Sequence, residues 1–366
     1  MKAYYNGRIF TGEEFLESYA VLVENGMVSG LVEEKSIPAN ADKIDLNGHF
    51  LAPALIDLQI YGGNDFLFSE KMSIESLEQT YQYCLAGGCA YFMITLATNS
   101  LEKFVAAAAV VNEYWVSGKK GLLGLHLEGP YINAAKKGAH IESFVRRASL
   151  PEVKTLIDDC LGTVKMITVA PEVCSDAVID YLLQQAIIVS AGHSAAKYEE
   201  AKKSFDNGVP AATHLYNAMS PLQHREPGLV GAILDHDKAV TSVVADGIHV
   251  DFAAIRIAKK VLGPRMFLIT DAVTTSAEGE YQHVFNKDHY TLPNGILSGS
   301  ALTMMNAVAN CVQHAGIEIG EALRMGSLYP AKLAGMQQFA GRIKEGYEAK
   351  FVEFNDNFGV VNIYTD

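Results

Sequence analysis

The chain of 366 residues is 49% hydrophobic and 19% charged, a composition typical of folded globular proteins that excludes the disordered and fibrous classes. Its 29 lysines and arginines are outnumbered by 42 acidic residues, which gives a net charge of -13. Nucleic-acid binding requires a basic surface that this balance does not supply, so we expect no nucleic-acid partner.

The cysteines and the first residues bear on the cellular compartment. Five cysteines are scattered along the chain without CxxC or zinc-knuckle spacing, so we expect reduced thiols. The chain reaches Arg8 without an apolar leader segment, and no uncharged apolar run is long enough to span a membrane. We therefore expect a cytoplasmic protein with no membrane partner.

The two ends of the chain have a β-strand pattern. Short runs with alternating hydrophobicity cover 3–10, 19–24, 27–33 and 43–51, and turn signals such as Asn25-Gly26 and Asn47-Gly48 separate them. This pattern predicts a small antiparallel β unit. Residues 341–366 have the same character, so we expect residues 1–51 and 335–366 to form one small β-sandwich domain.

Eight apolar runs lie between these ends, and each is continuous, as in strands that are buried on both faces. Most are separated by segments of helical periodicity, such as 73–86, 102–115, 175–185, 196–205 and 252–261. This succession predicts a (β/α)₈ TIM barrel over residues 52–334, with a doubly wound open sheet as the alternative. The runs cover 54–60, 90–97, 122–127, 164–170, 187–191, 211–215, 240–245 and 266–270.

Polar motifs end several of these runs, where a TIM barrel places its catalytic groups. Glu128 lies two residues beyond His126, His193 is surrounded by small residues, and His214 ends another run. Taken singly, the Glu is commonly an ion-pair partner and each His a hydrogen-bonded core residue. Together, two imidazoles and one carboxylate form the ligand set of a catalytic metal site, so the sequence predicts a divalent metal held by Glu128, His193 and His214.

Other motif residues fit the remaining roles of a hydrolase. Asp271 ends the last apolar run and is interpreted as a general base that becomes a general acid, with a helix N-cap as the alternative. His249 is expected to donate to the scissile carbonyl. Arg225, together with the backbone N–H groups after Asn217, is suited to clamp a phosphate, whereas an ordinary loop arginine would be solvated.

In combination these motifs resemble the N-acetylglucosamine-6-phosphate deacetylase branch of the amidohydrolase superfamily of metal-dependent TIM barrels. The similarity runs in order over nearly the whole chain. It is carried by GRIFTG (7–12), GLHLEGP (124–130), KKGAH (136–140), SAGHS (190–194), THLYNAM (213–219), REPG (225–228), DGIHV (246–250), TDA (270–272) and LSGS (297–300).

The resemblance implies an activity and a set of binding residues. The reaction would be hydrolysis of N-acetylglucosamine 6-phosphate to glucosamine 6-phosphate and acetate. His140, Asn217, Ala218 and Arg225 would bind the substrate, the last three around its phosphate, and His249 would contact the carbonyl or a sugar hydroxyl. Such enzymes are usually homodimers, and in some of them the partner subunit completes the phosphate site. The alternatives are an amidohydrolase for a different amide and a non-catalytic sugar-phosphate-binding protein.

The first barrel run departs from the common pattern of the superfamily, which has His-x-His at this position and binds a second metal. Here the corresponding residues are Gln59 and Tyr61, and Lys165 is interpreted as structural rather than as a bridging ligand. We therefore expect one metal ion per subunit. Zinc is the expected ion, with iron, cobalt and manganese as alternatives that suit the same ligands.

Overall fold

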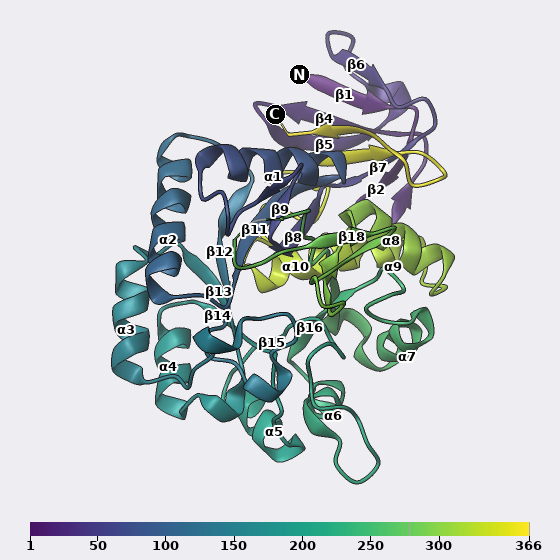
Figure 1. The fold of residues 1–366 in the computed structure, drawn as a ribbon. Helices are drawn as coiled ribbons and strands as arrows, with labels where there is room; N and C mark the ends of the chain where they lie inside the picture. Colours follow the sequence, from purple (N-terminus) through teal and green to yellow (C-terminus); the bar gives the residue numbers. More distant parts are fainter. Residues whose placement is uncertain (278, 366) are drawn as a thin grey trace.

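The computed structural model describes residues 1–277 and 279–365 (Figure 1). Its central element is an eight-stranded sheet in which each strand pairs in parallel with the next one along the chain. The predicted (β/α)₈ barrel is therefore confirmed. Its strands are β8 (Leu55–Ile60), β11 (Cys89–Ala97), β12 (Leu122–Glu128), β13 (Val164–Val169), β14 (Ile188–Ala191), β15 (Ala211–Ala212), β16 (Val240–Val244) and β17 (Met266–Ile269).

The first and last barrel strands meet at their carboxyl ends. The hydroxyl of Thr270, just after β17, donates to the buried Asp57 on β8 over 2.5 Å. Beyond it, the amide of Asp271 donates to the carbonyl of Gln59, and the amide of Tyr61 donates to the carbonyl of Ala272, both over 2.9 Å. This closure brings the ends of β8 and β17 together at the mouth of the barrel.

Helices surround the sheet, and side chains cap several of their first turns. Ser73, Ser100 and Ser149 each accept a hydrogen bond from an amide three residues ahead. No helix in the described ranges is long and apolar enough to cross a membrane. The helices are α1 (Ile74–Ala86), α2 (Leu101–Val116), α3 (Leu150–Asp159), α4 (Asp176–Gln184), α5 (Tyr198–Asp206), α6 (Gly228–Asp235), α7 (Phe252–Leu262), α8 (Met304–Gln313), α9 (Ile319–Gly326) and α10 (Leu328–Leu333).

Two further sheets are built from the ends of the chain, which lie close together in Figure 1. One has the order β5-β4-β1-β6 and the other the order β22-β21-β7-β2-β3. Tyr4 of the first sheet packs edge-on against Phe351 of the second, with ring centroids 5.5 Å apart. The strands are β1 (Lys2–Tyr5), β2 (Arg8–Phe10), β3 (Phe15–Leu16), β4 (Tyr19–Glu24), β5 (Met27–Glu33), β6 (Asp42–Asp45), β7 (Phe50–Pro53), β21 (Phe351–Phe354) and β22 (Val360–Tyr364).

The expectation of a purely antiparallel β unit is wrong. β1 pairs with β6 in parallel, and β2 pairs with β7 in parallel. Alternating hydrophobicity reports which face of a strand is buried and does not report the direction of its neighbour, so the pattern could not distinguish these pairings.

Short strands also lie near the barrel mouth. β9 (Gly62–Gly63) and β10 (Phe66–Leu67) form a hairpin directly after β8. A three-stranded antiparallel segment follows β17 and consists of β18 (Val284–Asn286), β19 (His289–Thr291) and β20 (Leu297–Ser300). Leu67 of β10 packs in a small apolar cluster with Ala97, Val273 and Tyr281.

Candidate metal centre and active site

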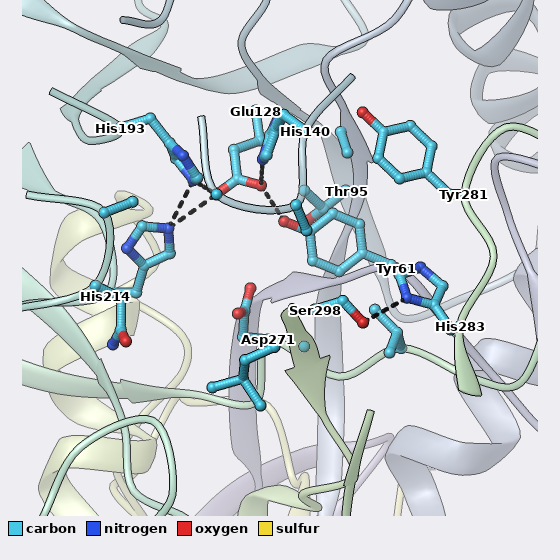
Figure 2. A pocket seen from close by; sticks show the side chains of 18 of the residues that line it. Tyr61, Thr95, Glu128, His140, His193, His214, Asp271, Tyr281, His283 and Ser298 are labelled. Carbon is cyan, nitrogen blue, oxygen red and sulfur yellow. Dashed lines mark hydrogen bonds and ion pairs between the residues drawn. The ribbon is translucent and has the colours of Figure 1, made fainter. Parts of the chain in front are cut away.

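A cavity of about 860 Å³, including its open mouth, lies at the carboxyl ends of the barrel strands (Figure 2). Most of the predicted site residues line it, although they come from several separate loops and strand ends. These residues are Glu128, His140, His193, His214, Asn217, Ala218, His249 and Asp271. Arg225 is exposed and is not part of this lining.

Three of the predicted ligand atoms converge. Oε1 of Glu128 lies 3.2 Å from Nε2 of His193 and 3.1 Å from Nε2 of His214, and the two nitrogens are 3.1 Å apart. All three residues are buried. Ligand atoms about 2.0 to 2.1 Å from a tetrahedral zinc ion lie about 3.3 Å from one another, so this triangle has the right size for such an ion.

The protonation of His193 agrees with this geometry. Its Nδ1 lies 2.9 Å from the carbonyl oxygen of Lys136, which can only accept, so Nδ1 carries the proton. In the neutral ring, Nε2 of His193 therefore presents a lone pair to a carboxylate oxygen. A lone pair and a carboxylate oxygen repel each other unless a cation lies between them. In addition, metal-binding histidines commonly donate from their other ring nitrogen to a backbone carbonyl, as Nδ1 of His193 does here.

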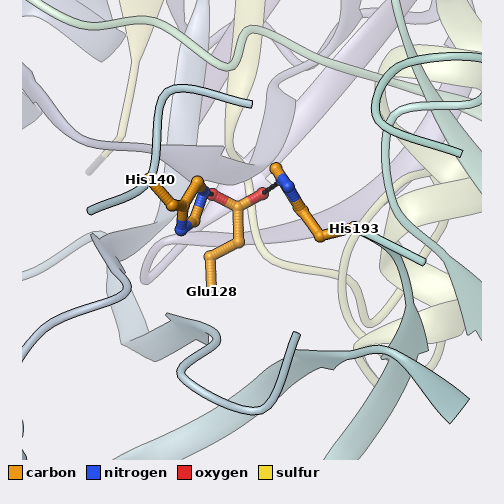
Figure 3. A group of neighbouring side chains, drawn as sticks. All are labelled: Glu128, His140 and His193. Atoms are coloured by element: carbon orange, nitrogen blue, oxygen red, sulfur yellow. Dashed lines mark hydrogen bonds and ion pairs between the residues drawn. The ribbon is translucent and has the colours of Figure 1, made fainter. Parts of the chain in front are cut away.

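His140 is also close enough to belong to a metal cluster with Glu128 and His193 (Figure 3). However, the amide of Thr98 donates to Nδ1 of His140 over 3.2 Å, so that nitrogen is unprotonated. Nε2 then carries the proton and donates to Oε2 of Glu128 over 3.0 Å. In this state His140 supports the carboxylate and has no lone pair to offer a metal, which favours His214 as the third ligand.

Gln59 and Tyr61 lie beside Glu128 at the end of the first barrel strand. Nε2 of Gln59 is 3.0 Å from Oε1 of Glu128 and 2.7 Å from Oδ1 of Asp271. The hydroxyl of Tyr61 donates to Oε2 of Glu128. Burial, together with the charges of Glu128 and Asp271, raises the pKa of Tyr61 well above its ordinary value, so it remains a neutral donor.

Asp271 is held in a strongly carboxylate-rich environment. Burial, followed by the charges of Glu128 and Asp57, raises its pKa well above the ordinary value, and the hydrogen bond from Gln59 acts in the opposite direction. A carboxyl group balanced between such opposing influences is suited to exchange a proton during a reaction.

The backbone is strained at several site residues, among them three that follow barrel strands. His193, His214 and Asp271 have φ values of +47°, +40° and +54°, in the left-handed region that residues with a side chain rarely adopt. Each of them follows the end of a barrel strand, so the chain turns sharply there. Such strain is concentrated at functional sites, where the surrounding structure holds it in place.

His249 also lines the cavity, and Asp246 fixes its ring. Nδ1 of His249 lies 2.6 Å from Oδ2 of Asp246, and the amides of His249 and Ile248 donate to Oδ1. Burial tends to raise the pKa of Asp246, but these bonds and the nearby imidazole lower it overall. The ionised carboxylate therefore orients the ring and leaves Nε2 for a ligand.

His126 and Lys165 lie outside the cavity lining. His126 is fully buried between the carbonyl of Leu58 and the hydroxyl of Thr168, and burial lowers its pKa to about 4. The ammonium of Lys165 lies 5.6 Å from the ring centroid of Trp115. Neither side chain lines the candidate site, and the structural role of Lys165 stays a prediction.

Comparison with known proteins agrees with the fold and the motifs. Residues 50–365 match the model of the amidohydrolase family, and residues 1–51 match the NagA composite domain. An N-acetylglucosamine-6-phosphate deacetylase of Haemophilus influenzae is 33% identical, with 96% of this chain and 95% of the relative covered. An N-acetylgalactosamine-6-phosphate deacetylase of Escherichia coli O157:H7 is 30% identical, with 98% and 96% covered.

A solved structure supports the same assignment. The crystal structure of N-acetylglucosamine-6-phosphate deacetylase from Pasteurella multocida superposes with a TM-score of 0.95 at 36% identity, covering 100% of this chain and 98% of the other. The match includes the terminal sheets as well as the barrel, because it extends over both chains almost completely. The chain therefore belongs to the amidohydrolase family and, within it, to the N-acetylglucosamine-6-phosphate deacetylases.

Proposed function

We propose that this enzyme hydrolyses the acetamide of N-acetyl-D-glucosamine 6-phosphate and releases D-glucosamine 6-phosphate and acetate. One observation carries the proposal: Oε1 of Glu128 and Nε2 of His193 and His214 converge within 3.2 Å in the same cavity as Asp271. The relatives that carry this activity in their names support the choice of substrate.

Glu128, His193 and His214 would hold one divalent ion, with zinc as the expected metal and iron, cobalt or manganese as alternatives. A bound ion of this kind supplies Lewis acidity, which polarises the amide carbonyl and acidifies water. The single ion is supported by Gln59 and Tyr61, which direct hydrogen-bond donors at Glu128 from the end of β8.

Asp271 would accept a proton from the attacking water on a carboxylate oxygen and deliver it to the leaving nitrogen of the sugar. The amide of Gln59 holds Oδ1 of this carboxylate and so fixes its orientation. With Nδ1–H donating to the ionised Asp246, the doubly protonated ring of His249 would donate from Nε2 to the carbonyl oxygen or to a sugar hydroxyl.

The substrate would be bound by His140, Asn217, Ala218 and Arg225, with the phosphate near the last three. Asn217 and Ala218 support this placement because they line the cavity. Arg225 is exposed and lies eight residues after Asn217. For Arg225 to bind the phosphate, its own loop or a second subunit has to complete the binding site. We propose a homodimer on this basis, and a cytoplasmic location because the five cysteines are free.

An acetate-release assay tests the function. Metal-loaded enzyme should deacetylate N-acetylglucosamine 6-phosphate, should act poorly on the unphosphorylated sugar, and should lose activity with a chelator and regain it with Zn²⁺. The N-acetylgalactosamine and N-acetylmannosamine 6-phosphates belong in the same series, because one relative at 30% identity is named for the galacto sugar. Absence of acetate release from the gluco substrate by the metal-loaded enzyme would contradict the proposal.

A further inference from the structure

Tyr61 is fixed in place next to the candidate metal centre. Its amide donates to the carbonyl of Ala272 over 2.9 Å, and its carbonyl accepts from the amide of Phe68 over 3.0 Å. Nε2 of Gln59 donates to its hydroxyl oxygen over 3.1 Å. That oxygen therefore accepts on one side, and its single proton is directed to Oε2 of Glu128.

The two oxygens of the Glu128 carboxylate consequently have different surroundings (Figure 2). Oε2 accepts from two protein donors, the hydroxyl of Tyr61 and Nε2 of His140. Oε1 faces the imidazoles of His193 and His214 and accepts from a single amide donor, Nε2 of Gln59, over 3.0 Å. Because the two donors lie on the same oxygen, the carboxylate cannot rotate without breaking both hydrogen bonds in a buried site, where unpaired polar groups are costly.

We infer that Tyr61 is a positioning residue for Glu128: its hydroxyl keeps Oε2 bound to the protein, so that the carboxylate meets the metal through Oε1 alone. This inference rests on the metal site of the proposed function. A second ion bound by the same carboxylate would need Oε2, and two hydrogen-bond donors already hold that oxygen. Tyr61 thus supports the expected single-ion site by hydrogen bonding, without being a metal ligand itself.

Metal affinity tests this role without any turnover measurement. Metal-free wild-type protein and Tyr61→Phe would be titrated with Zn²⁺ in competition with a chelator. Loss of a hydrogen bond to a ligating carboxylate should raise the dissociation constant about 10- to 100-fold, with one ion bound per chain in both proteins. Tyr114→Phe is the matched control, because its hydroxyl bonds to the carbonyl of Lys120 on the outside of the barrel and should not affect Zn²⁺ binding.

A double-mutant cycle with Glu128→Gln separates a role through Glu128 from a general loss of structure. If Tyr61 acts through that carboxylate, Tyr61→Phe should weaken Zn²⁺ binding in the wild-type background and have little further effect in Glu128→Gln. Equal weakening in both backgrounds would overturn the inference, even for a variant that is partly destabilised.

Cobalt substitution provides a second readout. The visible absorption of Co²⁺ falls as its coordination number rises above four, and a carboxylate released from Tyr61 is free to bind through both oxygens. Tyr61→Phe should therefore show a weaker visible band than wild type. If Tyr61→Phe keeps the Zn²⁺ affinity and the cobalt spectrum of the wild type, the inference about Tyr61 is overturned and the metal site stands. If the wild-type protein itself binds no Zn²⁺, the proposed metal site is overturned as well.

Discussion

Asp271 illustrates how neighbouring residues prepare a single side chain for chemistry. Burial raises the pKa of its carboxyl group, as do the nearby Glu128 and Asp57, and the hydrogen bond from Gln59 stabilises the ionised form. A residue that only bound the metal or capped a helix would not need this balance. This environment supports the proposed proton transfer by Asp271, since Glu128, the other carboxylate in the cavity lining, is the proposed metal ligand.

Asp271→Asn tests that assignment. The amide keeps the shape of the side chain but cannot take up a proton, so kcat should fall about 10²- to 10⁴-fold while the bound metal per chain is unchanged. The measurements are steady-state acetate release and elemental analysis. Asp251→Asn is a suitable control because Asp251 caps α7 outside the cavity lining. Near-normal turnover of Asp271→Asn would exclude the proposed acid/base role.

The sequence predicted which motif residues would come together but could not predict their individual contacts. Barrel topology alone implies that strand-end residues such as Glu128 and His214 meet at one mouth. The contacts of His140 and Tyr61 with Glu128 depend on the paths of loops, and spacing along the chain does not encode those paths. For the same reason Arg225, expected at a phosphate, lies exposed on its loop.

At the level of elements, continuous apolar runs located the barrel strands accurately. Seven of the eight predicted runs end within one residue of the observed strand end, whereas the run 211–215 contains only the two-residue strand β15. That strand stops early because His214 adopts a positive φ. The strands of the segment 284–300 are only three or four residues long, and their burial ranges from exposed in β18 to partly buried in β20. Such short strands carry no clear apolar repeat from which the sequence could predict them.

Strand β12 carries a buried histidine that should make stability depend on pH. The pKa of His126 is about 4 in the folded protein and about 6.5 in an unfolded chain. Between these two pH values the unfolded state binds the proton more readily than the folded state. The contribution of neutral His126 to the free energy of unfolding is therefore fully present above about pH 6.5 and is lost as the pH falls toward 4. The loss by pH 4.5 should be about 2 to 3 kcal/mol.

His126→Gln tests this linkage. At pH 7.5 the substitution should lower the free energy of unfolding, because it disturbs the hydrogen bonds to Leu58 and Thr168. At pH 4.5 the difference between wild type and variant should be smaller by about 2 to 3 kcal/mol, since only the wild type has the histidine to protonate. Urea unfolding of both proteins with chelator present measures this, and a difference that does not change with pH would refute the assignment.

Across the whole molecule, the two ends of the chain are joined by one buried carboxylate. Glu353 on β21 accepts hydrogen bonds from His49, Asn362 and Tyr364 over 2.7 to 2.8 Å. We propose that residues 1–51 and 335–366 form a β domain beside a barrel of residues 52–334. Val352 and Phe354, which flank Glu353, pack into the same apolar core as the barrel residues. The two parts should consequently unfold together.

The single tryptophan makes this coupling measurable, because Trp115 lies on α2 of the barrel, with its indole N–H bonded to the carbonyl of Leu122. Glu353→Ala leaves three donors of the β domain without their acceptor and should lower the free energy of unfolding by about 2 to 4 kcal/mol. If the domains unfold as one unit, the transitions followed by Trp115 fluorescence and by far-ultraviolet circular dichroism should shift together to lower denaturant concentration.

Asp356→Ala is the control. It removes only an exposed partner of Arg8 and should change the free energy of unfolding by less than about 1 kcal/mol. An unchanged Trp115 transition alongside an earlier loss of β signal would mean that the β domain unfolds independently of the barrel.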